Sequence, residues 1–209
     1  MSGIWPREIK CVVILTFDID GTSGALNRMP AAAKLPSLMS MREYGPNVGT
    51  PRILDLLDRY KIKASFYIPG YVIETNEDLV LDIMQRGHEI GHHGYLHEPP
   101  ATLNRELELE ILDKGIEIIR RLTGQAPKGY RAPSWELSDR SLSLIASRDL
   151  LYDSSLMGND IPYMVDVGNG RQIVEVPVHW ELDDYPYFDF APSLGSIRPI
   201  SNPETVFQS

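Results

Sequence analysis

The sequence predicts an α/β fold built on a parallel sheet, and three observations lead to this class. Short apolar runs alternate with segments whose apolar residues recur at helical spacing, as in repeated strand–helix units. Polar, charged and aromatic clusters follow the apolar runs, where α/β barrels carry their functional side chains. The chain has 209 residues, so we expect residues 1–209 to form a single domain with a substantial core.

Apolar runs mark about six candidate strands. The first, Cys11–Phe17, is β-branched and apolar throughout, which is typical of a strand buried on both faces. We therefore expect Cys11, the single cysteine, to be a small core residue. The clearest later strands are predicted at 64–68, 88–90, 150–152 and 173–178.

Helical segments separate these strands. The pattern at 50–60 opens with a threonine that can cap and a proline that suits the first turn. Glycines stop the next two helices, and the four predicted helices cover residues 50–60, 76–86, 102–123 and 138–147. Residues 21–45 carry two prolines and lack such a pattern, so they are predicted to form a long irregular loop.

The composition excludes some classes of binding partner and indicates a cellular compartment. The net charge of −9, with no block of basic residues, argues against a general binder of nucleic acid or of anionic membranes. A single cysteine excludes an intrachain disulfide and fits a reducing compartment. No apolar run has the length of a signal peptide core or of a bilayer span. We expect a cytoplasmic protein, and a homo-oligomer is left open.

Four of the five histidines lie between residues 88 and 98. If the chain coils helically after Gly91, His93 and His97 stand one turn apart on one face and can bind the same ion. A catalytic zinc needs a third ligand, and Asp18 and Asp20 at the end of the first strand are the nearest candidates. Solvated histidines and acids that cap a helix are the alternatives.

Four motifs in this order resemble the polysaccharide deacetylase (NodB-homology) family. They are Thr16-Phe17-Asp18-Ile19-Asp20, His93-Gly94-Tyr95-Leu96-His97, Arg131-Ala132-Pro133-Ser134-Trp135 and Tyr152-Asp153-Ser154-Ser155-Leu156. The stretches 158–163 and 180–188 are similar to one branch, which contains peptidoglycan-deacetylase-like proteins, allantoinase-like proteins and cyclic imide hydrolases. The resemblance covers nearly the whole chain and implies a distorted (β/α) barrel.

The resemblance also implies roles for five residues. Asp20, His93 and His97 would bind one divalent metal, most often zinc, and leave a position for water. Asp18 would act as general base, and Arg131 would pair with it and hold it ionised. A dication lowers the pKa of bound water to about 7 and can stabilise an oxyanion, so the chemistry is consistent.

Weaker candidates surround this set. Trp135 and Trp180 follow strands and could form an apolar wall that binds the substrate, or belong to the core. His88 and His92 are expected to be structural. The acids Asp153, Asp183 and Asp184 are expected to cap helices.

The sequence differs from the family pattern at one point. The family's last motif supplies a histidine that acts as general acid, and no such histidine precedes Ser209. We therefore expect a domain that lacks its C-terminal strands. The favoured function is metal-dependent hydrolysis of a non-peptide carbon–nitrogen bond. Its substrate would be a small cyclic imide or ureide, or the N-acetyl group of an amino sugar or peptidoglycan. The alternative is a metal-containing carbohydrate-binding or scaffold module.

Overall fold

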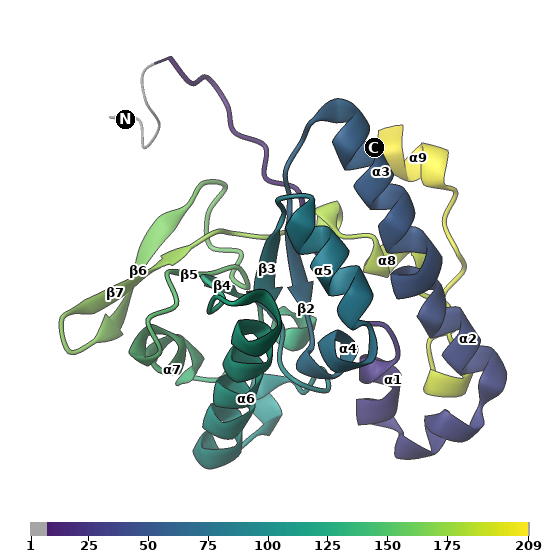
Figure 1. The fold of residues 1–209 in the computed structure, drawn as a ribbon, viewed down its shortest axis with the longest axis horizontal. Coiled ribbons are helices and arrows are strands. Elements are labelled where there is room, and N and C mark those ends of the chain that lie inside the picture. Colours follow the sequence, from purple (N-terminus) through teal and green to yellow (C-terminus); the bar gives the residue numbers. More distant parts are fainter. Residues whose placement is uncertain (1–7, 209) are drawn as a thin grey trace.

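The computed structural model describes residues 8–208 and shows one open sheet with helices packed against it (Figure 1). Within these residues the strand order is β1-β2-β3-β4-β5-β7-β6, and every neighbouring pair is parallel except β6–β7. The strands are β1 Thr16–Asp18, β2 Ser65–Ile68, β3 Glu89–His92, β4 Gly129–Tyr130, β5 Tyr152–Asp153, β6 Tyr163–Gly168 and β7 Arg171–Glu175. The α/β class is confirmed, and the sheet does not close in the described part of the chain.

The four predicted helices are confirmed with small shifts of their ends. The helices are α1 Ser23–Arg28, α2 Pro36–Tyr44, α3 Thr50–Tyr60, α4 Gly70–Thr75, α5 Glu77–Gln85, α6 Arg105–Thr123, α7 Ser141–Ser147, α8 Tyr185–Phe188 and α9 Pro203–Gln208. The longest, α6, has Asn104 as its N-cap, whose side chain accepts a hydrogen bond from Leu107 N–H, and Gly124, with φ +77°, as its C-cap. None of the described helices is long and apolar enough to cross a membrane.

Helices α3, α4, α5 and α6 bury one face of the sheet between β1 and β3. Leu54, Phe66 and Ile83 have no exposed surface in this core. A second core, between α6, α7 and strands β4, β5 and β7, contains Tyr130 and Ile173. Burying each of these side chains contributes about 1.5–3 kcal/mol.

Helix α6 lies unusually close to β3. A Cβ atom on Gly115 would stand 2.1 Å from Nε2 of His92, so only glycine fits at this crossing. His92 in turn hydrogen-bonds through Nε2 to the carbonyl of Leu112 at 3.1 Å. Burial lowers the pKa of His92 to about 4. The neutral imidazole of His92 therefore links β3 to α6, which agrees with the structural role expected for it.

The N-terminal apolar run differs from the prediction. Its strand is limited to Thr16–Asp18, Cys11 is exposed, and Val13 is 76% exposed. Among the described residues β1 pairs only with β2, so the earlier part of the run has no neighbouring strand to cover it. An apolar pattern shows that a segment can be buried, but not that a partner is present.

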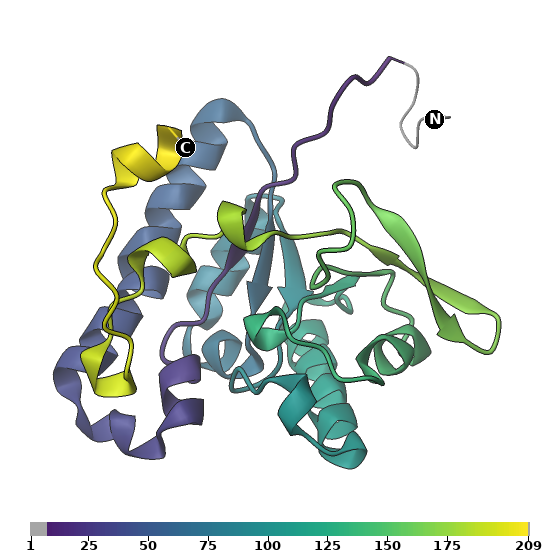
Figure 2. The same cartoon turned by 180° about the vertical axis from the view of Figure 1, so that it is seen from behind.

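The predicted loop at residues 21–45 is also wrong, because it folds into α1, a 3₁₀ turn at Pro30–Lys34 and α2. Each proline stands at the first turn of its element, where its missing N–H costs nothing. Residues after β7 run back beside these helices (Figure 2), where Asp189 pairs with Arg42 at 2.8 Å. The sequence interpretation did not include β6, the outer strand of the antiparallel hairpin.

Candidate metal centre and catalytic site

The predicted site residues meet at the carboxyl end of the sheet. Asp18 ends β1, and Asp20 follows it where the chain turns at Gly21, whose φ is +50°. His93 follows β3 and Arg131 follows β4. Because β1, β2, β3 and β4 are parallel neighbours, their carboxyl ends lie at the same edge.

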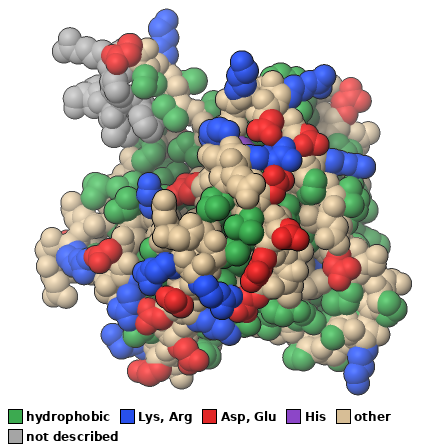
Figure 3. Space-filling model, in the orientation of Figure 1, with side chains coloured by type: hydrophobic (Ala, Val, Ile, Leu, Met, Phe, Trp, Pro, Cys, Tyr) green, Lys and Arg blue, Asp and Glu red, His purple; other side chains and the backbone are tan. Residues whose placement is uncertain are grey.

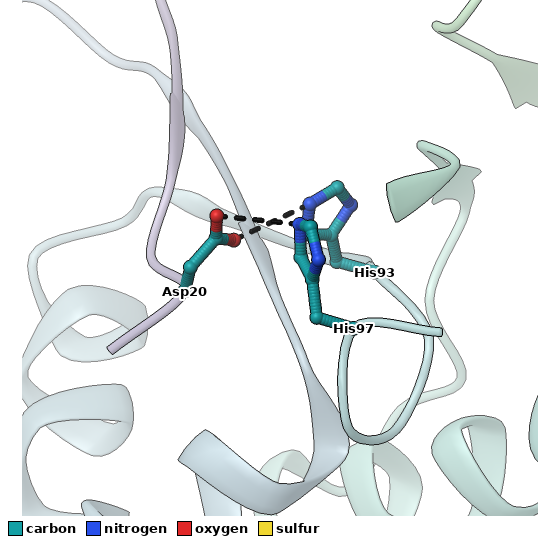
Figure 4. A group of neighbouring side chains, drawn as sticks. All are labelled: Asp20, His93 and His97. Carbon is teal, nitrogen blue, oxygen red and sulfur yellow. Dashed lines mark ion pairs between the residues drawn. The ribbon is translucent and has the colours of Figure 1, made fainter. Parts of the chain in front are cut away.

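Three side chains converge on one point in Figure 4. The Oδ1 atom of Asp20 lies 3.4 Å from Nε2 of His93, and its Oδ2 atom lies 3.3 Å from Nε2 of His97. One ligand atom from each residue lies within 4.8 Å of the others. The structure therefore brings together the three residues that the sequence proposed as ligands.

The histidine motif is a loop, so the expected helical spacing of His93 and His97 is wrong. Gly94 has φ +73°, a conformation that favours glycine, and His97 has φ +62°. The carboxylate of Glu98 closes the turn by accepting from the N–H groups of Tyr95 at 3.1 Å and Leu96 at 2.8 Å. The imidazoles converge because the chain folds back, and not because they share a helix face.

The three residues fit a divalent metal. One carboxylate and two imidazoles, with a ligand atom from each within 4.8 Å of the others, form a donor set that zinc takes in proteins. His93 Nδ1 lies 2.8 Å from the carbonyl of Arg131, an arrangement that fixes the ring and leaves Nε2 for a metal. Asp20 Oδ1 is buried without a hydrogen-bond partner. Burial raises the pKa of Asp20, but the two imidazoles outweigh it and hold this pKa well below the usual value.

Arg131 holds Asp18 through a hydrogen-bonded ion pair of 2.7 Å. Its guanidinium also donates to Thr16 Oγ1 at 3.0 Å and to the carbonyl and hydroxyl of Ser154 at 2.9 and 2.8 Å. The arginine is 2% exposed and lies 4.1 Å from the ring centroid of Tyr67. A buried cation with this many acceptors keeps one geometry, so Asp18 is fixed beside the three ligands.

Trp135 and Trp180 form a stacked pair, with centroids 4.4 Å apart and planes at 26°. The indole N–H of Trp135 donates to Asp18 Oδ2 at 3.3 Å, so the pair adjoins the carboxylate. Ser134 and Trp135 both have positive φ, +58° and +54°, a strained backbone that presents the indole at this place. The 39% exposure of Trp180 leaves aromatic surface open to a ligand.

The structure also places four further acids, three of which were predicted to cap helices. The capping interpretation of Asp153 is wrong, because this residue is fully buried at the end of β5. Glu175, which the sequence analysis did not name, lies beside Asp153. An acid inside an apolar run was the one sequence feature that could have indicated it. Burial, then the charges of Asp184 and Asp18, raise the pKa of Asp183 to about 6. Asp184 stands at the N-cap of α8 without a side-chain cap.

The fold and these side chains define a class: a parallel α/β protein with carboxylates and imidazoles converging at the carboxyl edge of its sheet. The sequence profile of the polysaccharide deacetylase family matches residues 7–152, and the chain belongs to this family. This is a family of deacetylases, enzymes that act on carbon–nitrogen amide bonds other than peptide bonds.

Similar proteins agree with this assignment. A peptidoglycan deacetylase of Helicobacter pylori is 36% identical over 91% of this chain and 74% of its own length. A peptidoglycan deacetylase-like protein of Gibberella zeae is 30% identical over 96% of this chain and 66% of its own. A solved structure from Mycobacterium smegmatis, assigned to the polysaccharide deacetylases, is 40% identical with a TM-score of 0.93 and covers 98% of this chain and 71% of its own.

A solved allantoinase shares the fold alone, with 21% identity, a TM-score of 0.75, and coverage of 86% of this chain and 65% of its own. The chain thus spans roughly two thirds to three quarters of these four proteins' lengths.

Proposed function

We propose that residues 1–209 form a catalytic domain that hydrolyses an N-acetyl amide bond with the help of one divalent metal. Asp20, His93 and His97 would hold the ion, and Asp18 would act as general base. A divalent cation supplies Lewis-acid chemistry, since it lowers the pKa of water and polarises an amide carbonyl. The observation that carries the proposal is the convergence of Asp18 with the three candidate ligands beside an open aromatic wall.

The chain's own residues divide the remaining work. The side chain of Asp18 is held by Arg131 and is 22% exposed, so its carboxylate can take a proton from water at the edge of the site. His93 Nε2 lies 3.8 Å from Asp18 Oδ2, which places the base next to the proposed ligands. Trp135 and Trp180 would bind the substrate through their exposed ring surface.

An amino-sugar glycan is the substrate class that we favour. The two relatives reported above are named for peptidoglycan deacetylation. An open cavity of about 470 Å³, lined by Trp135, Asp139 and Asp166, adjoins the aromatic wall and would give room for neighbouring units of a saccharide chain. The metal is expected to be zinc, because two imidazoles and one carboxylate suit that ion.

A small cyclic imide or ureide is the second candidate. The nearly parallel indoles beside Asp18 offer a flat surface that would cover a planar ring. A binding or scaffold module that holds a metal without turnover is the alternative from another class.

The experiment is a hydrolysis screen of the purified chain, stripped of metal and then loaded with Zn²⁺. Acetate release from chitooligosaccharides and peptidoglycan fragments is compared with ring opening of succinimide, hydantoin and allantoin. We expect metal-dependent acetate release, unchanged in Asp113→Asn, which removes an exposed ion pair with Arg148. Ring opening without acetate release would favour the second candidate. Bound zinc without either reaction would favour the binding module.

A further inference from the structure

Two buried acids beside the proposed site have no part in the function described so far. Asp153 on β5 and Glu175 on β7 are register partners in a parallel pair, so their side chains stand side by side on one face of the sheet. Neither has any exposed surface. Like charges at neighbouring positions repel, and burial strengthens the repulsion because water cannot screen it.

The donors that reach these carboxyls are neutral in the described part of the chain. The Ser155 N–H donates to Asp153 Oδ2 at 3.1 Å and to Glu175 Oε1 at 3.0 Å. The Leu156 N–H donates to Glu175 Oε1 at 2.9 Å, and the Ser155 hydroxyl donates to Asp153 Oδ1 at 2.9 Å. The second oxygen of Glu175, Oε2, is buried without a partner.

A single proton shared by the two carboxyls would relieve both the charge repulsion and the unpaired oxygen of Glu175. It would remove one of two like charges and would give Glu175 Oε2 the donor that it lacks. Burial and the charge of Glu175 raise the pKa of Asp153 well above its usual value. Burial also raises the pKa of Glu175, although its hydrogen bonds and, after them, the nearby charge of Arg131 oppose this shift.

The backbone held by these acids leads to Arg131. Ser155 Oγ accepts a hydrogen bond from the N–H of Ala132 at 2.9 Å, directly after the arginine. Ser154 supplies two of the acceptors that orient the guanidinium. Arg131 then contacts Asp18 through its side chain and His93 through its carbonyl. The acids therefore fix the base and one proposed ligand without touching either.

We infer that Asp153 and Glu175 share one proton, and that Glu175 is a positioning residue that holds the 154–156 backbone against Arg131. The catalytic part of this inference rests on the proposed function. The shared proton and the fixed arginine do not, so they can be tested in a protein without activity.

The proton is tested by infrared spectroscopy at pH 7. A protonated buried carboxyl has a C=O band apart from the carboxylate bands. We expect this band in the parent protein and in Asp113→Asn, and its loss in Glu175→Gln, where Asp153 becomes the only carboxyl of the pair and ionises. A parent protein without the band, or a band that persists unchanged in Glu175→Gln, would overturn the shared proton.

The positioning is tested with Glu175→Ala and Glu175→Gln. Alanine leaves the Leu156 N–H without its acceptor, so exchange of the Arg131 Nε hydrogen, followed by ¹⁵N NMR, should accelerate. Glutamine keeps the acceptor oxygen and should restore the protection. If the protein is an amidase, Glu175→Ala should lower kcat about 10- to 100-fold. KM and metal content should stay near the parent values, and glutamine should recover most of kcat.

Each outcome decides one part of the inference. Unchanged arginine exchange in folded Glu175→Ala contradicts the positioning role, whatever the activity. Loss of kcat that glutamine does not restore also contradicts it. If alanine prevents folding, Glu175→Asp provides the same test, because its shorter carboxylate withdraws from both amides. A parent without amidase activity but with the expected band and exchange would reject the proposed function alone.

Discussion

The two ends of the sheet contribute to the proposed site in different ways. At the β1–β4 end, Asp18, His93 and Arg131 follow directly from strands that α3, α5 and α6 cover. From the β5–β7 end, the chain continues past the hairpin to Trp180 and Asp183, which belong to a short 3₁₀ helix at Trp180–Leu182 and its C-cap. The candidate metal site is therefore built on a buried frame. The wall over the substrate is carried by a more exposed segment.

The largest expected effect tests the β1–β4 end. Asp18→Asn should lower turnover about 10²- to 10⁴-fold and leave metal bound, because it removes the base and keeps the three ligands. Asp20→Ala should abolish turnover and lose the metal. The measurements are kcat and metal content after dialysis. If Asp18→Asn strips the metal while Asp20→Ala keeps it, the two roles are reversed.

Stability should also differ between the ends. Leu54, on α3, has no exposed surface, and Leu54→Ala should lower the free energy of unfolding by about 2–5 kcal/mol. Leu182, in the segment after β7 that carries Trp180, is 86% exposed, and Leu182→Ala should change that free energy by no more than about 0.5 kcal/mol. Urea unfolding measures both. Equal losses would show that the wall is as tightly packed as the frame.

A smaller effect is expected at the aromatic wall. Trp180→Ala removes the stacked ring and should weaken substrate binding by about 0.5–1.5 kcal/mol, seen as a higher KM with little change in kcat. Trp180→Phe keeps an aromatic face and is the matched control. A fall in kcat at constant KM would instead place Trp180 in contact with the reacting atoms.

The smallest effect concerns pH. The pKa of Asp183 is about 6 in the folded protein, because burial, Asp184 and Asp18 disfavour its charge. In the unfolded chain it is about 3.9. The folded state therefore holds this proton more tightly, and the stability that Asp183 contributes is present below about pH 4 and lost as the pH rises through about 6.

Asp183→Asn should remove that component. The difference in unfolding free energy between variant and parent should shift in favour of the variant as the pH rises across this window. Thermal unfolding at several pH values measures it, with Asp139→Asn, an exposed acid, as the control. A constant difference between pH 4 and 6 would contradict the raised pKa of this half-buried carboxyl.

Local sequence patterns predicted strands β2 and β3 and the helices α3, α5 and α6 better than they predicted the aromatic wall of Trp135 and Trp180. Helix α6 could be read from its apolar spacing and from Gly124, because caps and periodicity are local properties. The metal centre could be located because its motifs follow strands that become neighbours. Its loop geometry could not, since the φ of His97 depends on contacts such as Asn27 to the His97 carbonyl at 3.1 Å.

Residues whose role depends on distant neighbours escaped the sequence analysis. Cys11 lies in an apolar run but is exposed, because burial requires a neighbouring strand. Glu175 reads as a strand residue, and only the register with Asp153 shows that two acids meet. The space-filling view shows charges of both signs mixed on one face (Figure 3), in agreement with a sequence that has no basic block.

Because Gly115 has no side chain, α6 can pack close to β3. This close packing limits which residues the position accepts. A methyl group there would meet His92 Nε2 at 2.1 Å, so any other residue must push the helix outwards. The loop with His93 and His97 connects this strand to this helix and would be dragged along. A saturation library should therefore rank Gly115 among the least tolerant positions, although it is none of the proposed metal ligands.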